Sequence, residues 1–214
     1  MEALTAVLTG DLIGSTEAIP DRLERSMAAL AHHASLIGPD TRFTRFRGDG
    51  WQIYLPRPQD FLWVAVYLNA VLRSDPRGCL PSRIAIGLGR TDRLGPAGLS
   101  GASGTAFIHS GRALDAMVRV GQNIALAGEA TDDIQRGIIA FIDDRITGWS
   151  QEQANVAMLR LTPQTDPTQT EIAAILGITR QAVSARFRAA GLSLILNACY
   201  AFRDHFQRPE DRHE

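Results

Sequence analysis

Two aspartates, each next to a glycine, are the residues of this sequence with the clearest chemical use. Asp11 follows a short apolar run at residues 3–8, and Asp49 lies in a turn between two β-prone runs. If the first strand is central in a sheet, both carboxylates reach the same end of it. Such a pair suits Mg²⁺ or Mn²⁺, which bind carboxylate and phosphate oxygens. The pattern also fits plain turn and cap residues, because aspartate beside glycine is common in turns.

The glycines and the serine around Asp11 predict a phosphate-binding segment. Gly10, Gly14 and Ser15 belong to the segment that leads into the next predicted helix. Backbone N–H groups in such a segment hold phosphate oxygens, so residues 12–15 are expected to cradle a phosphate. The partner predicted for this end of the sheet is a phosphate ligand with its metal ion.

A second chemically suggestive segment lies at residues 168–190. A helix-turn-helix needs a small residue where its helices cross, and Ala173 supplies it. The turn needs a residue that tolerates positive φ, which is Gly177, and Thr179 is a suitable N-cap for the second helix. This spacing predicts that the second helix enters the major groove of DNA. The side chains expected to contact DNA are Thr179, Arg180, Gln181, Ser184 and Arg188.

The alternative interpretation is a helical hairpin used only for dimer packing. The whole chain has a net charge of −1, and residues 163–191 carry three arginines against two acids. Because so little positive charge faces the phosphates, tight DNA binding would need two copies of the segment. A homodimer is therefore expected.

The elements that must position these residues divide into two parts. Up to about residue 126, the apolar spacing predicts the order β-α-β-β-α-β, typical of a ferredoxin-like α+β sheet with helices on one face. Beyond it only helices are predicted, so the expected domains are residues 1–126 and an all-α domain at 127–214. The predicted strands are 3–8, 41–47, 51–55 and 82–89, the predicted loop is 95–104, and the predicted helices are 19–37, 61–72, 105–117, 132–147, 150–161, 169–176, 179–190 and 193–206.

Composition is that of an ordinary folded protein, with 45% hydrophobic and 21% charged residues. No apolar run approaches the ~18–20 residues that a membrane span needs, and the first residues do not resemble a signal peptide. The sequence has 2 cysteines, too few for a disulfide framework. We expect a cytoplasmic protein with no membrane partner.

Three motifs resemble those of class III nucleotide cyclases. Residues 10–16 are similar to the D-x-x-G-S-T signature of the catalytic domain, residues 47–51 to its G-D-G hairpin, and residues 83–89 to its R-x-G-x-x-x-G strand. The resemblance implies that Asp11 and Asp49 bind two metal ions that hold a triphosphate and activate a hydroxyl.

The same resemblance assigns two arginines and shows one departure. Arg45 stands where the family has its base-reading lysine, and Arg112 matches the transition-state arginine. Four residues before that arginine the family has an asparagine, where this sequence has Ile108. Isoleucine cannot orient a ribose, which argues against cyclisation and leaves nucleotide binding expected.

Residues 3–206 as a whole are similar to the SatD-like family of small bacterial proteins. That family has a GD-(I/L)-x-GS motif, an F-R-G-D hairpin, a G-x-A-F helix start (residues 104–107 here) and a C-terminal helix-turn-helix. The resemblance implies a cyclase-like domain followed by a helix-turn-helix.

Three functions follow from these observations. The first is a DNA-binding regulator, in which the cyclase-like domain binds a nucleotide or phosphate ligand with a divalent metal and controls a dimeric helix-turn-helix. The alternative is an active metal-dependent nucleotide cyclase or nucleotidyltransferase using Asp11 and Asp49, with the helical part as a targeting or dimerisation module. The third is a cyclase fold that serves only as a dimerisation platform.

Overall fold

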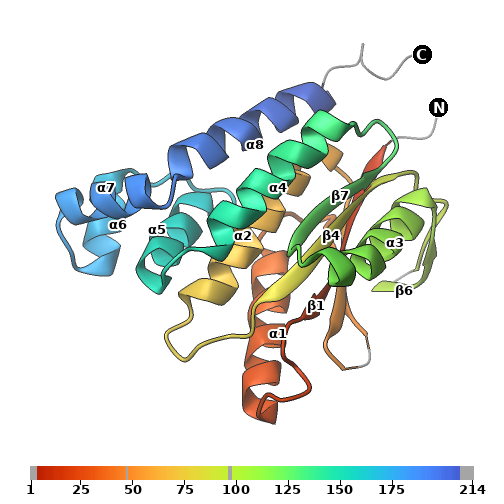
Figure 1. Cartoon of the computed structure of the whole chain (residues 1–214), viewed down its shortest axis with the longest axis horizontal. Helices are drawn as coiled ribbons and strands as arrows, with labels where there is room; N and C mark the ends of the chain where they lie inside the picture. The colour runs from red at the N-terminus through yellow and green to blue at the C-terminus, as the bar shows by residue number, and fades with distance from the viewer. Residues whose placement is uncertain (1–3, 47, 96–97, 208–214) are drawn as a thin grey trace.

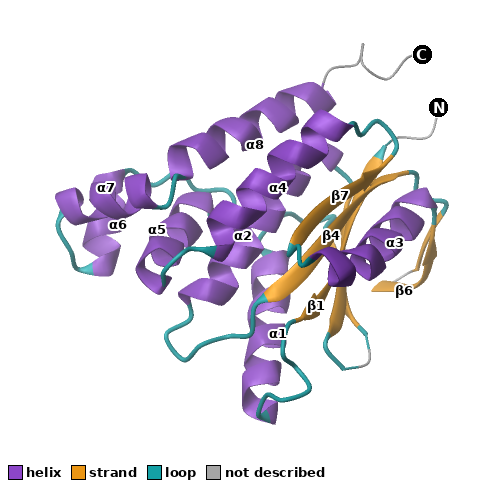
Figure 2. Cartoon of the chain, in the orientation of Figure 1, coloured by secondary structure: helices purple, strands orange, loops and turns teal. Residues whose placement is uncertain are grey.

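A five-stranded sheet lies at the centre of the protein, with helices on both of its faces (Figures 1 and 2). The computed structural model describes residues 4–46, 48–95 and 98–207. The strand order is β2-β3-β1-β4-β7, and β5 and β6 form a separate two-stranded sheet. The strands are β1 (Thr5–Leu12), β2 (Arg42–Arg45), β3 (Gly50–Leu55), β4 (Ser82–Gly89), β5 (Arg93–Gly95), β6 (Gly98–Ser103) and β7 (Ile124–Gly128).

The central strand, β1, is apolar on both of its faces. It pairs antiparallel with β3 on one side and with β4 on the other. Ala6 and Leu8 join a large hydrophobic cluster on one face of the sheet, and Val7 joins a smaller cluster on the other face. Burial on both faces explains why the sequence shows a continuous apolar run here instead of alternation. The predicted α+β class is confirmed.

α1 (Pro20–Ser35) and α2 (Phe61–Ser74) lie on one face of the sheet, as the β-α-β-β-α-β order predicts, but α3 (Thr105–Val120) covers the other face. α3 packs on the face opposite the large cluster, where the Ser110 hydroxyl lies 2.8 Å from the Thr9 hydroxyl of β1. Gly87 of β4 allows this approach, because a Cβ there would lie 2.2 Å from the carbonyl oxygen of Ala106. Residue spacing predicts the helix but does not choose its side of the sheet. The helices of the first part are α1 (Pro20–Ser35), α2 (Phe61–Ser74) and α3 (Thr105–Val120), with a short 3-10 helix η1 (Pro58–Asp60).

The loop predicted at residues 95–104 contains a strand, β6, which pairs with β5. Its sequence is rich in glycine and serine, so the usual β-branched signal is missing. Leu99 holds β6 against the main sheet, because its side chain is buried and its backbone N–H donates to the Thr44 hydroxyl at 2.9 Å. Pro96 and Ala97 lie outside the described residues.

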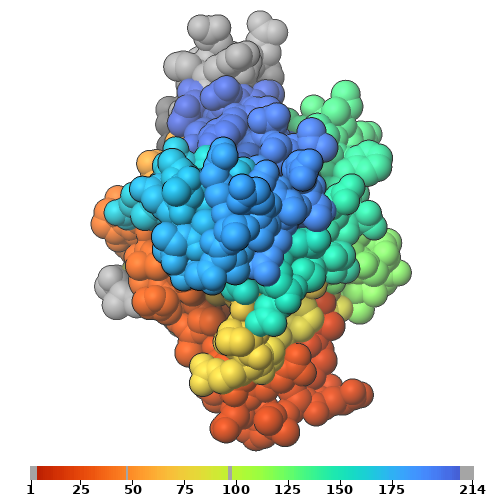
Figure 3. Space-filling view, turned by 90° about the vertical axis from the view of Figure 1, so that its left-hand side faces the viewer, coloured from red at the N-terminus to blue at the C-terminus, as the bar shows by residue number. Residues whose placement is uncertain are grey.

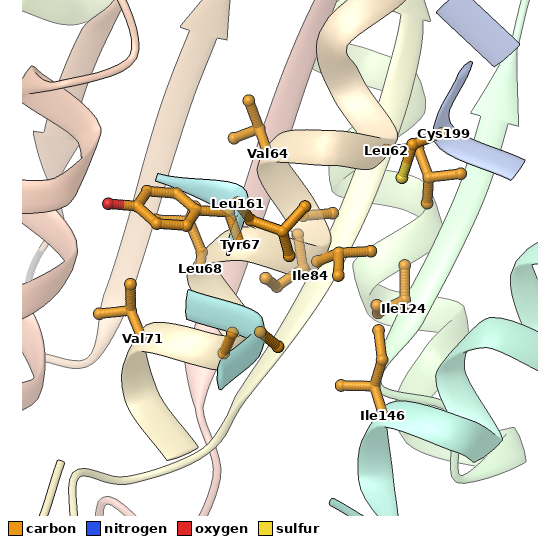
Figure 4. Close-up of a cluster of buried hydrophobic side chains, with 14 of the residues drawn as sticks. Leu62, Val64, Tyr67, Leu68, Val71, Ile84, Ile124, Ile146, Leu161 and Cys199 are labelled. Carbon is orange, nitrogen blue, oxygen red and sulfur yellow. The ribbon is translucent and has the colours of Figure 1, made fainter. Parts of the chain in front are cut away.

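The sequence also predicts no strand at residues 124–128, where the structure has β7. This strand pairs parallel with β4 at the edge of the sheet. The predicted domain boundary at residue 126 lies inside this strand. Figure 4 shows Tyr67 of α2, Ile84 of β4, Ile124 of β7 and Ile146 of α4 (Asp133–Thr147) within one buried cluster. The sheet part and the helical part therefore share a hydrophobic core.

The helices predicted after residue 130 are present, and three begin with a capping box. These boxes join Asp132 to Gln135, Ser150 to Gln153, as the sequence predicts, and Thr168 to Glu171. No helix in the described part of the chain has both the length and the hydropathy needed to cross a membrane. The helices are α4 (Asp133–Thr147), α5 (Gln151–Leu161), α6 (Gln169–Leu176), α7 (Arg180–Ala189) and α8 (Leu192–Gln207).

Candidate functional site

The structure brings the two aspartates to the same end of the sheet. Asp11, near the end of β1, pairs with Gly50 of β3, and Asp49 is the residue before Gly50. The backbone N–H of Leu12 donates to the carbonyl oxygen of Asp49 at 3.3 Å, which ties the turn to β1. Pairing between strands, and no local feature, creates this arrangement.

Each aspartate already has a partner. The Nε of Arg83 donates to the Oδ1 of Asp11 at 2.8 Å, and both side chains are about a quarter exposed. Arg83 lies directly opposite Asp11 on β4, so the ion pair follows from the strand register. The hydroxyl of Ser15 donates to the Oδ2 of Asp49. The sequence places Arg83 only within a strand motif and predicts no partner for it. Its partner, Asp11, lies 72 residues away in the chain.

The glycine beside Asp11 has a packing role. Gly10 is buried, and a Cβ there would lie 2.4 Å from the indole of Trp51 and 2.5 Å from the carbonyl oxygen of Arg83. The side chain of Trp51 is fully buried, and its indole N–H donates to the Ser82 hydroxyl at 3.0 Å. The close indole is the reason why position 10 lacks a side chain.

The predicted phosphate cradle at residues 12–15 is only partly available. The N–H groups of Leu12 and Ile13 already donate to backbone carbonyl oxygens. Gly14 has φ +74° in open space, and Ser15 follows it in a turn. α1 begins only at Pro20, so its N-terminus does not directly follow this turn. Gly14 and Ser15 are the parts of the cradle that can still face a ligand.

Arg45, the expected base-reading residue, is held by α1. Its guanidinium donates to both carboxylate oxygens of Glu24, at 2.7 and 2.8 Å, and to the carbonyl oxygen of Gly48. The hydrogen bonds from Arg45 lower the pKa of Glu24. Arg45 thus lies beside the hairpin that carries Asp49, but a base could bind it only by displacing Glu24. Arg47 of the same motif lies outside the described residues.

Arg112 and Ile108 both lie on α3, the helix on the face of the sheet opposite the large hydrophobic cluster. Arg112 is exposed, and Ile108 is 50% exposed. Within the described residues, no hydrogen bond or ion pair joins Arg112 to Asp11 or Asp49. The transition-state role that the resemblance implies for Arg112 therefore has no contact that supports it.

The donor atoms at this end of the sheet fit Mg²⁺ or Mn²⁺ in type. Asp11, Asp49 and Ser15 offer only oxygen atoms, which these ions prefer. The described residues contain no group of three or more histidines, cysteines or acids able to hold a metal on their own. Magnesium is often bound by one or two carboxylates together with waters and substrate phosphates. The pair suits a metal that arrives with a phosphate ligand.

The helical segment at residues 168–190 forms two short helices joined by a tight turn. The C-cap of α6 is Gly177, which has φ +64°. The N-cap of α7 is Thr179, whose hydroxyl accepts from the Ala182 N–H at 3.1 Å. Ile172 and Val183 are fully buried and join the main core cluster. The turn and cap roles predicted for Gly177 and Thr179 are confirmed.

The predicted DNA contacts lie on the outer side of this pair. Thr179, Arg180, Gln181 and Arg188 are exposed, and Ser184 is half-buried. Figure 3 shows the segment at one end of the molecule, where no described part of the chain covers its outer surface. The cap hydrogen bond occupies the Thr179 hydroxyl, whereas the two arginines and the glutamine have no described partner in the chain.

A cavity that the sequence did not suggest lies where the sheet part meets the helical part, with a volume of about 470 Å³. Trp63 and Tyr200 have ring centroids 5.8 Å apart, and the guanidinium of Arg203 lies 5.1 Å from the Trp63 ring. Arg203 also donates to Asp60 at 3.0 Å. These residues come from η1, α2 and α8, so no local motif marks the cavity.

Comparisons with known proteins find fold similarity only. No protein-family model matches the chain, and no curated protein matches it. A bacterial light-regulated adenylyl cyclase is 14% identical, with a TM-score of 0.41, covering 59% of this chain and 76% of that one. The active GGEEF domain of a Vibrio cholerae diguanylate cyclase is 13% identical, with a TM-score of 0.44 and coverages of 61% and 85%. The guanylyl cyclase Cya2 is 18% identical, with a TM-score of 0.30 and coverages of 59% and 77%.

Proposed function

We propose that the protein is a DNA-binding regulator that contacts DNA through α7. The observation that carries this proposal is the division of α7 into two sides. Val183 is fully buried against the core, while Arg180, Gln181 and Arg188 are exposed and turned away from it. A helix that is anchored on one side and carries arginine and glutamine on the other fits the major groove.

The residues of α7 differ in the DNA groups that they suit. Arg180 and Gln181 lie in the first turn, the part of a recognition helix that reaches the base edges. Arginine binds guanine through two acceptors, and glutamine binds adenine through one donor and one acceptor. Arg188 lies two turns further on and suits a phosphate. Thr179 and Ser184 complete the surface as smaller polar contacts.

The sheet end with Asp11 and Asp49 is proposed as the site of a nucleotide or phosphate ligand with Mg²⁺ or Mn²⁺. The support is that both aspartates lie at the same end of the sheet, together with the open Gly14–Ser15 turn. A bound metal would offset the repulsion between the carboxylates and the phosphates. Ligand binding would control DNA binding only if the ligand favours one of two arrangements of the helical part.

An active nucleotide cyclase or nucleotidyltransferase is the second candidate, and the same two aspartates favour it. Asp11 and Asp49 would hold the metal, whose positive charge would stabilise the negative charge on the phosphoryl group during transfer. Ile108 weakens cyclisation in particular, and so does the lack of a described contact between Arg112 and either aspartate. The enzymatic candidate is tested by incubating the protein with each nucleoside triphosphate and Mg²⁺ or Mn²⁺. Pyrophosphate release that Asp49→Ala abolishes would place this function first.

DNA binding is tested by a mobility shift with the region upstream of the protein's own gene and with a shuffled fragment. Arg180→Ala is expected to weaken binding about tenfold or more, because a good base contact contributes ~1–3 kcal/mol. Arg119→Ala, an exposed arginine on α3, serves as the matched control and should bind as wild type does. Equal losses in both variants, or no shift with either fragment at low salt, would overturn the proposal.

A further inference from the structure

The outer side of α4 carries an apolar stripe that the described part of the chain leaves uncovered. Ile134 is 75% exposed, Ile138 is 38% exposed and Phe141 is 81% exposed. An adjacent side of the same helix is buried against the core through Ile139 and Ile142. Single exposed apolar residues are common, but several large ones in a row on a helix mark an interaction surface.

The spacing of this stripe is symmetric. With Arg145 at its end, the positions are 134, 138, 141 and 145, separated by four, three and four residues. All four lie on one side of an α-helix, because these separations are close to one or two turns. The order of spacings is the same in both directions. Two antiparallel copies of α4 therefore align Ile138 of each with Phe141 of the other.

A glycine beside the stripe points to close contact with another helix. Gly137 lies inside α4, where glycine costs about 1 kcal/mol relative to alanine. A Cβ at Gly137 would meet nothing within 4 Å, so the packing of this chain does not require glycine there. With no side chain at Gly137, an apolar side chain of a second copy can approach the α4 backbone next to Phe141, which lies one turn further along.

The charges at the two ends of α4 complement each other in the antiparallel arrangement. Arg145, in the last turn, is exposed and lies along Gly191. Asp133, in the first turn, is 98% exposed and binds Arg136 at 2.7 Å. An antiparallel second copy brings Arg145 of each chain beside the first turn of the other, where Asp133 lies. The antiparallel helix dipoles also favour this alignment.

We propose that α4 forms a two-fold symmetric homodimer with α4 of a second copy. Ile138 and Phe141 form its centre, and Arg145 pairs with Asp133 at each end. The same patch serves both chains, as a closed two-fold interface requires. This proposal goes beyond the DNA-binding function and does not rest on it, since it concerns a surface on another helix.

The test is sedimentation of the full-length chain across micromolar concentrations. Wild type should sediment as a dimer, and Phe141→Glu should raise the dissociation constant about a hundredfold or more, because it buries two unpaired charges at the centre. Val118→Glu is the matched control, since Val118 is 59% exposed on α3. Circular dichroism and thermal unfolding of both variants check that the fold is retained.

A charge exchange makes the test specific for the antiparallel arrangement. Asp133→Arg alone and Arg145→Asp alone should each weaken the dimer, and the double variant should recover most of the loss. Three results would overturn the proposal: a monomeric wild type, a Phe141→Glu variant that dimerises as wild type does, or a Val118→Glu variant that is equally impaired. A double variant that is weaker than both single variants would exclude the antiparallel pairing.

Discussion

Individual side chains at the sheet end are fixed by contacts with distant residues. Asp11 is bound by Arg83 of β4, and Asp49 is bound by Ser15 of the loop between β1 and α1. Any ligand at this end must compete with, or share, these hydrogen bonds. The two aspartates could be chosen from the sequence because they adjoin glycines, but Arg83 could not be assigned to Asp11 before the strand register was known.

The contact between Gly10 and Trp51 gives a prediction about stability. Gly10→Ala should lower the free energy of unfolding by about 1–3 kcal/mol or more, because the new methyl group meets both an indole and a backbone carbonyl. Gly111→Ala is the control, since a Cβ at Gly111 on α3 meets nothing within 4 Å. Urea unfolding measures both. A wild-type stability in Gly10→Ala would mean that the indole does not lie against this glycine.

His33 gives a prediction about pH. Its Nδ1 lies 2.5 Å from the Tyr67 hydroxyl, and burial lowers the pKa of His33 below the usual 6.5 while raising the pKa of Tyr67 to about 12. Tyr67 therefore stays protonated and shares a hydrogen bond with the His33 ring. Because unfolded His33 takes up a proton more readily, its contribution to stability is present above pH 6.5 and declines as the pH falls below it.

The measurement is urea unfolding at about pH 8 and about pH 5. His33→Gln should lose less stability on acidification than wild type does, since it removes the group that protonates on unfolding. His205→Gln, at an exposed position on α8, should behave as wild type. If all three proteins lose stability equally, the acid sensitivity comes from other groups.

At the scale of elements, the turn between α6 and α7 sets the orientation of α7 relative to α6. Gly177 has φ +64°, a conformation that costs other residues about 1 kcal/mol or more. Gly177→Ala should therefore destabilise the protein by about that amount and weaken DNA binding. Gly148→Ala is a suitable control, because Gly148 ends α4 with φ −81°. DNA affinity and urea unfolding measured together separate misplacement of α7 from global unfolding.

At the scale of the whole molecule, the sheet and the helical part share one core. Tyr67 and Ile84 pack in the same cluster as Ile146 and Leu161 (Figure 4). The indole N–H of Trp63 also donates to the carbonyl oxygen of Leu161 at 2.9 Å. Contacts of this kind couple the folding of the two parts, and they give a route by which a ligand at the sheet could affect the helices.

This shared core predicts a single unfolding transition. Tryptophan fluorescence and far-ultraviolet circular dichroism should give coincident urea curves, because Trp51 reports on the sheet, Trp149 on the helical part, and both unfold together. Two separated transitions would show that the helical part folds on its own.

The sequence alone determined the features that depend on neighbouring residues: helix spacing, capping boxes, the Gly177 turn and the glycine-flanked aspartates. These follow from local geometry and can be recognised within one or two turns of helix. Only the tertiary structure decided that β6 and β7 are strands, that α3 lies on the second face, and that Arg83 binds Asp11. Each depends on hydrogen bonds or burial between segments far apart in the chain. Such contacts do not require any regular spacing of apolar or polar residues within a segment, so the sequence alone does not reveal them.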